Sequence, residues 1–445
     1  MPADASLSHA IIHTATPLVG APFDFDPLLE RIGDKRFVLL GEATHGTHEF
    51  YQLRAELTQR LIREKGFSAI ATEGDWPDTY RINRYIRDET NDADAIDALA
   101  DFRRFPQWMW RNADVLDLIG WLRTYNDHVA EDSRKIGFYG LDLYSLHASI
   151  AAVASYLEDK DPELADDARA RYACFDRFGE EPQQYGYATS RGHPNCRPEV
   201  VAELLEIERH REHLLQRDGV MAAEDQFSAE QNARVVVRAE EYYRLMYQGG
   251  VSTWNLRDTH MADTLDALSE HLAQRGLPPK IIVWAHNSHV GDSAATQRGA
   301  LDELTLGHLC RERHPDETFL LGFSTYEGTV TAASDWGGVA ERKHVRPGLS
   351  GSYEELFHAT GMERFMLLLD NLGEAAGALR EPRLQRAIGV VYRPDTERFS
   401  HYLEVDLPDQ LDAIIHLDET RALEPIERTA IWEHGELPET YPSGL

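Results

Sequence analysis

The segment Gly41–Phe50, GEATHGTHEF, places a glutamate and a histidine three residues apart between an apolar run and an amphipathic stretch. An imidazole titrates near neutral pH, so His45 can take a proton from water and act as a general base. A nearby carboxylate, here Glu42, can orient the ring and stabilise its charged form. Gly41 and Gly46 predict a tight turn that most other residues could not make. The alternative is a helix-capping turn around a buried, hydrogen-bonded histidine.

A second motif, Ala71–Asp78 with the sequence ATEGDWPD, also places polar residues directly after an apolar run. Glu73 has the position of a second carboxylate at the end of a strand. Asp75 and Trp76 follow it and are candidates for binding a substrate in the same cleft. For this segment the alternative is that the polar residues only begin the next helix.

The third motif, Trp284–Asp292 with the sequence WAHNSHVGD, places His286 and His289 three residues apart after an apolar run. Two such histidines can share one site. They could bind a metal ion, or act as a general acid and an electrostatic stabiliser. The alternative is a pair of histidines on a surface loop.

Three smaller signals add polar residues to this group. Asp142 ends another apolar run, and Trp254 and Arg257 in TWNLRD share one face of a predicted helix. An arginine on an apolar face needs a carboxylate or a developing oxyanion as its partner, because burying it alone is costly. Arg54 lies about two turns into the helix after GEATHG and could reach Glu42 or a substrate oxygen. For both arginines the alternative is a structural ion pair.

Motifs of several other enzyme classes are absent from the sequence. There is no GxSxG nucleophile elbow, no phosphate-binding P-loop, no GxGxxG and no HExxH. No cysteine lies near the motifs to act as a nucleophile. We therefore expect a hydrolase with this set to activate water directly, without a covalent intermediate. We expect no cofactor, with a divalent metal such as zinc or manganese as the alternative.

Short continuous apolar runs predict the buried strands that would position these residues. They cover residues 37–40, 68–72, 135–139, 281–285, 319–323, 365–369, 388–392 and 413–416. Helical patterns separate most of them, which predicts an α/β fold with a mainly parallel central sheet flanked by helices. In the first helix, Thr47 is the expected N-cap and Gly66 the expected C-terminal stop. Ligands bind at the carboxyl ends of strands in such sheets, so the motifs are expected to meet there.

The stretch between residues 151 and 250 shows no convincing strand and predicts a helical lobe or cap that forms a deep cleft with the core. Residues 199–216 and 229–247 predict a helical hairpin joined by a polar loop, and residues 179–198 predict a long irregular loop. The expected organisation is an α/β core in two parts, residues 1–150 and 251–445, with the lobe at 151–250.

Composition limits the partners and the compartment. The formal net charge of −31 disfavours binding to nucleic acids and to anionic membranes, and 42% hydrophobic residues is ordinary globular composition. Cys174, Cys196 and Cys310 are few and far apart, so we expect no disulfide framework. No stretch approaches the roughly 20 apolar residues needed to cross a bilayer. We expect a cytoplasmic protein with a small-molecule substrate; the sequence does not indicate its oligomeric state.

Through GEATHG, TEGDW, WNLRD and HNSHVGD, in that order, the chain resembles the erythromycin esterase family from about Leu39 to its last strands. The resemblance implies an α/β core with a helical lobe and a deep cleft. Members that confer antibiotic resistance hydrolyse the macrolide lactone ester by water attack. The resemblance implies roles for seven residues: His45 as base, Glu42 as its orienting carboxylate, Glu73 as a second acid, Arg54 and Arg257 as site arginines, and His286 and His289 as histidines facing the base.

The expected reaction begins when His45, oriented by Glu42 or Glu73, removes a proton from water. The hydroxide then attacks an ester or lactone carbonyl, while Arg257 and one of the paired histidines stabilise the oxyanion or protonate the leaving alkoxide. A metal-dependent hydrolase or peptidase is one alternative. Another is a non-enzymatic haem- or iron-binding protein, because the wider superfamily that the fold resembles includes one.

Overall fold

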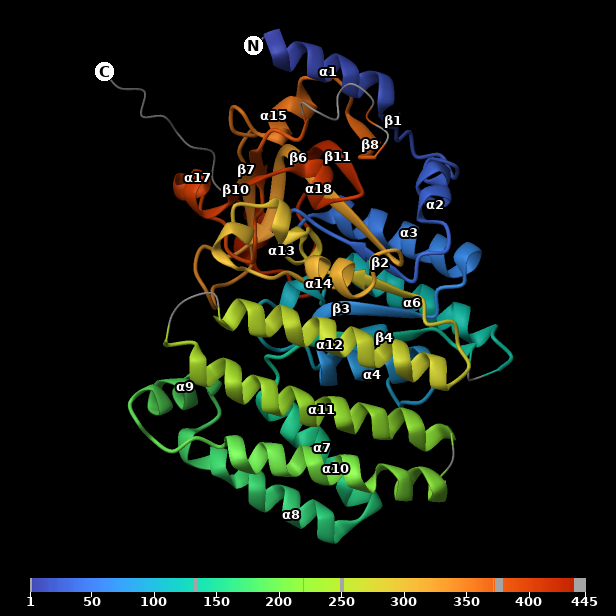
Figure 1. Ribbon diagram of the computed structural model, residues 1–445, viewed down its shortest axis with the longest axis vertical. Helices are drawn as coiled ribbons and strands as arrows, with labels where there is room; N and C mark the ends of the chain where they lie inside the picture. The colour runs from blue at the N-terminus through green and yellow to red at the C-terminus, as the bar shows by residue number, and fades with distance from the viewer. Residues whose placement is uncertain are drawn as a thin grey trace.

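The computed structural model describes residues 2–131, 134–218, 220–248, 252–370, 372 and 379–435. Within these residues a nine-stranded sheet has the order β1-β8-β11-β6-β2-β5-β3-β4, with β7 paired to β6 (Figure 1). Its strands are β1 (Thr16–Pro17), β2 (Phe37–Leu40), β3 (Ala69–Asp75), β4 (Gly137–Asp142), β5 (Ile281–Trp284), β6 (Thr318–Ala332), β7 (Glu341–Val345), β8 (Arg364–Leu368) and β11 (Ala413–Thr420). All neighbours from β11 to β4 are parallel, so the predicted α/β fold with a mainly parallel central sheet is confirmed.

Helices surround this sheet and extend beyond it. They are α1 (Pro2–Thr14), α2 (Asp26–Ile32), α3 (His48–Lys65), α4 (Trp76–Ile86), α5 (Ala95–Ala98), α6 (Ala113–Asp127), α7 (Leu146–Lys160), α8 (Pro162–Tyr172), α9 (Pro182–Ser190), α10 (Arg197–Asp218), α11 (Val220–Leu245), α12 (Ser252–Gln274), α13 (Asn287–Val290), α14 (Leu306–Arg313), α15 (Tyr353–His358), α17 (Glu397–Ser400), α18 (Leu407–Gln410) and α19 (Ala430–His434). A separate two-stranded sheet pairs β9 (Arg383–Arg386) with β10 (Tyr402–Val405). No described helix combines the length and apolar composition needed to span a bilayer.

The central strands are buried on both faces, which explains their continuous apolar sequences. Successive side chains of a strand point to opposite faces. In β2, Phe37 and Leu39 join the core formed with α1, α12, α14 and α15, whereas Val38 and Leu40 join the core formed with α2, α3 and α6. Helices therefore pack on both sides of the sheet.

One predicted strand, at residues 388–392, is wrong. The segment forms only isolated bridges, between Thr44 and Ile388 and between Ala333 and Val391. Ile388 and Tyr392 are buried in a small separate core with Val330 of β6. The apolar run therefore reflects a loop packed against the end of β6, and not a strand of the sheet. The other predicted strands all correspond to strands of the central sheet.

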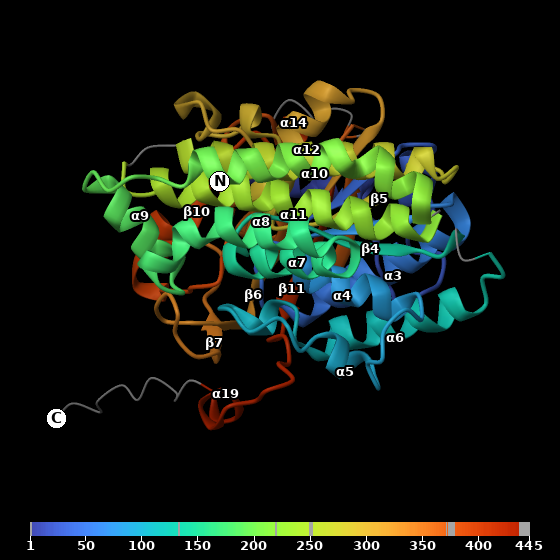
Figure 2. The ribbon, with the colours of Figure 1, turned by 90° about the horizontal axis from the view of Figure 1, so that it is seen from below.

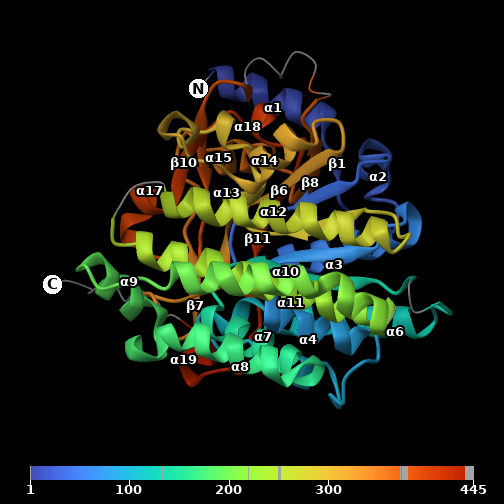
Figure 3. The same ribbon diagram turned by 60° about the horizontal axis from the view of Figure 1, so that its bottom comes forward.

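Helices α7 to α11 form a lobe with a hydrophobic core of its own. The lobe lies beyond the β4 edge of the sheet and contacts the core through α4 and α12 (Figures 2 and 3). The predicted helical hairpin corresponds to α10 and α11, but the polar loop expected between its helices is wrong. The described residues there are helical, and the segment AAEDQFSAEQ is rich in helix-forming residues. Residues 179–198 also contain α9, so they are not wholly an irregular loop.

The expectation that the cysteines form no disulfide is wrong. Cys174 and Cys196 are bonded, with their Cα atoms 5.8 Å apart, and Cys310 is free and buried. The bond joins the segment after α8 to the residue before α10. It therefore closes a loop of the chain that contains α9. Spacing along the sequence could not show this pairing, because the packing of the lobe brings the two residues together. Disulfides persist best in oxidising compartments, so the cytoplasmic location stays a prediction.

Candidate active site

The turn GEATHG leaves the carboxyl end of β2 and lies against β6 and the segment after β5. Neither Gly41 nor Gly46 has a positive φ. A Cβ atom on Gly46 would lie 1.8 Å from the carbonyl oxygen of Thr331, and one on Gly41 would lie 2.1 Å from Asn287 Oδ1. Close packing therefore favours glycine at both positions, against the backbone of β6 at Gly46 and mainly against the Asn287 side chain at Gly41. The unusual turn conformation that the sequence suggested is not the reason.

Helix α3 follows this turn and carries Arg54 back towards it. Thr47 has the N-cap position, but its side chain makes no capping hydrogen bond and instead contacts the hydroxyl of Thr44. The helix ends at Gly66, which has a φ of +70° in the left-handed region, as predicted. The predicted bounds of this helix are confirmed, although the predicted capping interaction is not formed.

His45, Glu42 and Arg54 form a buried chain of charge-assisted hydrogen bonds. His45 Nδ1 lies 2.9 Å from Glu42 Oε1, and Arg54 Nη2 donates to Glu42 Oε2 at 2.5 Å. A carboxylate can only accept, so Nδ1 carries a proton, and in the neutral form of the ring the lone pair lies on Nε2. The guanidinium of Arg54 lies 4.4 Å from the ring centroids of both Tyr51 and Trp284. Arg54 is thus held in place and holds Glu42 in turn; it does not reach an open surface.

Glu73 lies on β3 between Thr72 and Asp75, where the regular backbone pairing with β4 is interrupted. Its Oε1 accepts from Arg257 Nη2 at 2.7 Å, and its Oε2 accepts from the backbone N–H of His286 at 2.9 Å. Its Oε1 also lies 3.4 Å from His289 Nε2 and 4.0 Å from His45 Nε2. Burial alone would raise the pKa of Glu73, but the charges of His289, Arg257 and His45 outweigh it and hold that pKa well below its ordinary value.

Arg257, near the start of α12, joins two carboxylates of the core. Besides Glu73, it donates to Asp142 at the end of β4, from Nε at 2.9 Å and from Nη2 at 2.6 Å. Its guanidinium also lies 5.0 Å from the ring centroid of Tyr144. Burial alone would lower the pKa of Arg257, but Asp142, Tyr144 and Glu73 raise it well above its ordinary value. The arginine therefore stays charged and fixes the two strand-end carboxylates relative to α12.

His286 and His289 are three residues apart in sequence but lie in different environments. His286 lies over His45, with ring centroids 4.7 Å apart, and its pKa is well below the ordinary value because of burial and the nearby His45. His289 places Nδ1 2.9 Å from both oxygens of Asp258. Burial alone would lower the pKa of His289, but Asp258 and Glu73 raise it to about 9. The two histidines are therefore suited to different protonation states.

The remaining predicted residues are placed close to this cluster or beneath it. Asp75 is tied to Arg104 at 3.0 Å and accepts from the N–H of Tyr144 at 3.1 Å. Trp76 is 1% exposed and donates to Ser228 of the lobe at 3.2 Å, so it anchors the lobe and does not line an open surface. Trp254 stacks on His289 with ring centroids 4.6 Å apart and an interplanar angle of 6°.

Asp258 is a residue of the cluster that the sequence interpretation missed. It is fully buried and contacts His289 and the backbone N–H of Leu306. A signal for it was present, because Asp258 follows Arg257 directly and shares a helix face with Trp254 and Met261. A carboxylate on a buried helix face needs a partner.

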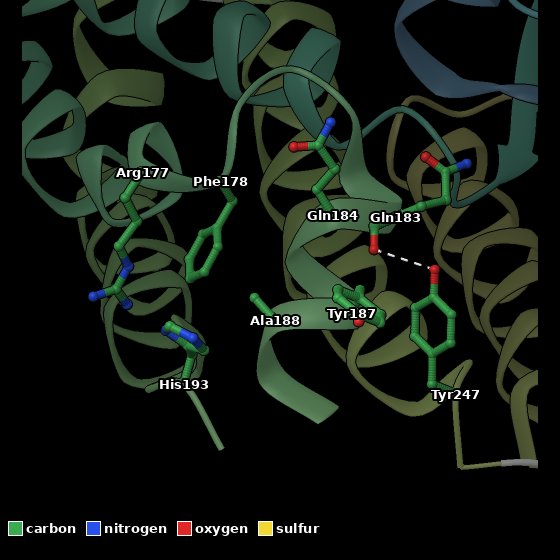
Figure 4. Close-up of a pocket in the computed structure, with 8 residues that line it drawn as sticks. All are labelled: Arg177, Phe178, Gln183, Gln184, Tyr187, Ala188, His193 and Tyr247. Atoms are coloured by element: carbon green, nitrogen blue, oxygen red, sulfur yellow. Dashed lines mark hydrogen bonds between the residues drawn. The ribbon is translucent and has the colours of Figure 1, made fainter. Parts of the chain in front are cut away.

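The cluster is nearly closed to solvent, with His45 only 7% exposed. A cavity of about 680 Å³ lies elsewhere, in the lobe, where Phe178, Gln184, Tyr187 and Tyr247 are among its lining residues (Figure 4). None of the residues lining that cavity belongs to the cluster. Within the described part of the chain, no three His, Cys, Asp or Glu side chains are placed to hold a metal ion together.

Comparison with known proteins decides the family. The model of the family described as erythromycin esterase matches residues 62–420, which is more than half of the chain. The chain belongs to the erythromycin esterase family. The matched stretch includes Glu73, Asp142, Arg257, His286 and His289. The erythromycin esterase type II of Escherichia coli is 23% identical over 426 residues, which cover 91% of this chain and 94% of that protein.

Solved structures of other proteins share the fold of this erythromycin esterase family member. A protein from Bacillus cereus matches with a TM-score of 0.79 at 18% identity, over 95% of this chain and 99% of that chain. A mutant of the erythromycin esterase EreC, solved in its open conformation, matches with a TM-score of 0.63 at 20% identity, over 92% of this chain and 97% of that one. At these identities the structures establish the fold alone. Membership of the family supports a hydrolase as the general class.

Proposed function

We propose that this protein hydrolyses a carboxylic ester or lactone by activating water with His45. The observation that carries the proposal is the geometry of the imidazole. Its Nδ1 is held by Glu42 at 2.9 Å, while its Nε2 lies 4.0 Å from Glu73 Oε1, too far for a direct hydrogen bond. The lone pair on Nε2 is therefore available to a water molecule. Glu42 and Arg54 keep the ring in the required tautomer.

The other groups of the cluster supply the remaining parts of the reaction. Proton transfer from water to His45 Nε2 leaves a hydroxide, which adds to the carbonyl carbon and places negative charge on the carbonyl oxygen. Arg257 is the cation of the cluster whose guanidinium can stabilise that charge. His286 or His289 then protonates the leaving oxygen. Glu73 keeps Arg257 and the two histidines aligned.

A serine nucleophile is not part of the proposal. Ser324 and His416 do form a hydrogen bond of 2.8 Å, and His416 Nε2 lies 3.6 Å from Asp418. However, Ser324 is 1% exposed and His416 is 0% exposed, between β6, β11 and α15. Hence a substrate carbonyl would not reach this serine. The proposed reaction also needs no metal ion, and the substrate itself is not assigned.

The test combines a substrate screen with a matched pair of variants. Wild-type protein and His45→Asn are incubated with a panel of lactones, simple esters and peptides, and products are detected by mass spectrometry as a gain of one water. We expect an ester or lactone product that His45→Asn forms at a rate lower by about 10²- to 10⁴-fold. The control is His48→Asn, which changes a histidine of the same motif that pairs with Asp114 at 2.8 Å.

Three results would contradict the proposal. They are full activity of His45→Asn on a substrate of the wild-type protein, cleavage of peptides only, and activity that chelation abolishes and zinc or manganese restores. Release of product by both His45→Asn and His48→Asn at equally reduced rates would indicate a general structural defect, and would remove the support for His45 as base.

A further inference from the structure

Two histidines are candidates for the proton donor, and their hydrogen bonds distinguish them. His286 Nε2 lies 3.1 Å from the carbonyl oxygen of Ile388, which can only accept, so Nε2 carries a proton. His286 Nδ1 accepts from the backbone N–H of Ser288 at 3.2 Å and lies 2.8 Å from the Ser288 hydroxyl. A second proton on Nδ1 would face that N–H donor, and only the Ser288 hydroxyl could accept it. Burial and the nearby His45 also hold the pKa of His286 well below its ordinary value, so this ring favours the neutral state.

His289 has partners for either protonation state at the same nitrogen. Its Nε2 lies 2.9 Å from Arg257 Nη1, which can only donate, and 3.4 Å from Glu73 Oε1, which can only accept. Neutral His289 can thus accept from Arg257, and protonated His289 can donate to Glu73. A group that gives up and regains a proton during turnover needs both kinds of partner, because neither state is then left without a hydrogen bond.

Asp258 fixes the orientation of the His289 ring and therefore the direction of its Nε2. Its two oxygens both lie 2.9 Å from His289 Nδ1, and its Oδ1 also accepts from the N–H of Leu306 at 2.8 Å. Asp258 is 0% exposed, and the ring of Trp254 stacks flat on the imidazole. Asp258 therefore keeps the proton on Nδ1, fixes the ring and turns Nε2 towards Glu73 and Arg257.

We propose that Asp258 is the positioning residue of His289, and that this pair makes His289, and not His286, the proton donor to the leaving oxygen. The inference rests on the proposed ester or lactone hydrolysis. The cluster then contains two carboxylate–histidine pairs with opposite tasks. Glu42 and His45 accept a proton from water, whereas Asp258 and His289 deliver one to the alcohol.

The protons balance over one turnover. His45 Nε2 gains a proton from water as the hydroxide forms its bond to the carbonyl carbon. When the carbon–oxygen bond to the alcohol breaks, the proton on His289 Nε2 moves to the departing oxygen, which leaves as the alcohol. His289 is then neutral and accepts from Arg257. Transfer of the proton from His45 to His289 through solvent restores the starting state, and the net change is the addition of water to the ester.

Four ionisable groups face His289 and together set its titration. They are Asp258 and Arg257 of α12, Glu73 of β3, and His286 before α13. Asp258 and Glu73 favour the protonated ring, whereas burial and Arg257 oppose it, and the resulting pKa is about 9. The ring is therefore protonated at neutral pH before each turnover.

The test uses two esters of the same acid, 4-nitrophenyl butyrate and ethyl butyrate. Nitrophenolate leaves without a proton, whereas ethoxide must be protonated as it departs. Asp258→Asn keeps an oxygen that can accept from His289 and Leu306, but it removes the charge. We expect its rate on the ethyl ester to fall by about 10²-fold and its rate on the nitrophenyl ester to stay within about threefold. Asp266→Asn on the same helix, which removes a carboxylate 2.7 Å from His314, is the matched control and should change neither rate.

A second readout follows the ring itself and needs no substrate. An NMR titration should show the pKa of His289 lower by about one unit or more in Asp258→Asn than in the wild-type protein, and unchanged in Asp266→Asn. Equal loss on both esters, an unchanged His289 titration, or a selective loss of ethyl ester hydrolysis in His286→Gln would overturn the inference. If Asp258→Asn does not fold, His289→Gln should show the same selective loss, and equal losses in that variant would overturn the inference as well.

The design separates this inference from the proposed function. Rates that do not depend on His45 for either ester would end the proposed function. Rates that depend on His45 but show no selective effect at Asp258 or His289 would end only the present inference. If neither ester is a substrate, the His289 titration still decides whether Asp258 holds the proton on this ring.

Discussion

Two buried glutamates, Glu73 and Glu224, have partners of the same residue types but lie at opposite ends of the strands of the sheet. Glu73 at the carboxyl ends of the strands contacts Arg257 and His289, and the ring of that histidine stacks on an indole. Glu224 of α11 contacts Arg275 and lies 3.1 Å from His271. Helix α12 spans both clusters, because Arg257 lies near its beginning and Arg275 just after its end.

The Glu224 cluster even repeats the aromatic stacking. The ring of Phe227 lies 4.0 Å from the ring of His271 with an interplanar angle of 5°. The cluster lies near the amino ends of the strands, where Arg87 approaches Glu224 to 3.9 Å and donates to the carbonyl oxygen of Lys135 before β4. In both clusters burial alone would raise the glutamate pKa and cationic partners lower it.

The two clusters differ in whether one hydrogen-bonding atom stays available to water or a substrate. Glu224 accepts from Tyr139 at 2.7 Å and from Asn83 at 3.4 Å as well as from its cationic partners, so its oxygens are fully occupied by the protein. Glu73 instead faces His45 Nε2 across 4.0 Å, too far for a direct hydrogen bond, and in the neutral ring that nitrogen carries the lone pair. The same residue types and a lowered glutamate pKa therefore occur both in a candidate active site and in a structural ion-pair cluster. The second, formed by Glu224, His271, Arg275 and Phe227, is called the clip below. Position at the carboxyl edge and an unused base distinguish the candidate active site.

The largest expected difference concerns activity. We predict that Glu73→Gln lowers kcat on any ester or lactone substrate by about 10³-fold, because Arg257 and both histidines lose the charge that aligns them. Stopped-flow or steady-state assays of the folded variant measure this effect. Glu224→Gln is the matched control and should keep kcat within about twofold. Comparable losses of kcat in the two variants would remove the functional distinction between the clusters.

The next effect, on stability, has the opposite pattern. We predict that Glu224→Gln lowers the free energy of unfolding by about 3 kcal/mol, because it leaves Arg275 and His271 buried without their carboxylate. Denaturant titration followed by circular dichroism measures the loss. Glu73→Gln should cost less, since Arg257 keeps both hydrogen bonds to Asp142. A larger loss of stability in Glu73→Gln would show that the candidate active-site cluster, and not the Glu224 cluster, holds the lobe to the core.

A third prediction concerns acid. The pKa of Glu224 lies below the ordinary glutamate value of 4.5, so its stabilising contribution is complete above that pH and is lost as pH falls towards the folded-state pKa. Between pH 6 and pH 3 the wild-type protein should lose about 2 kcal/mol more stability than Glu224→Gln. Urea unfolding at several pH values gives this difference. Parallel stability curves for the two proteins would contradict the ionised Glu224 that the comparison assumes.

The contrast also shows what the sequence could reveal. Each motif of the candidate site follows a continuous apolar run, and β2, β5, β3 and β4 are neighbours in the sheet, so their strand-end residues meet. Local sequence therefore predicted the fold class and brought Glu42, His45, Glu73 and His286 to one edge. The role given to each residue stays a prediction.

Long-range contacts were not predictable in the same way. The Cys174–Cys196 bond, the carbonyl of Ile388 that binds His286, and the clip at Glu224 join segments that no local pattern relates. Their partners are set by packing of the lobe and of the loop after β9. The burial of Trp76 against the lobe was not predictable for the same reason, because the lobe is distant in sequence, and its role in substrate binding stays a prediction.

The smallest expected effect concerns Trp254 and Phe227, the two rings that stack on the histidines of the two clusters. Trp254→Phe keeps an aromatic face on His289 but loses the hydrogen bond from Nε1 to the carbonyl oxygen of Leu304, which is 3.0 Å long. We predict a loss of about 1 kcal/mol in stability, and a change in kcat below about threefold, because Asp258 still orients the ring. In the clip, Phe227→Leu removes the stacking itself and should lower stability by about 1 kcal/mol with kcat unchanged. Thermal melts and assays of both variants measure these effects. A tenfold loss of kcat in Trp254→Phe would mean that indole stacking, and not Asp258 alone, sets the position of His289.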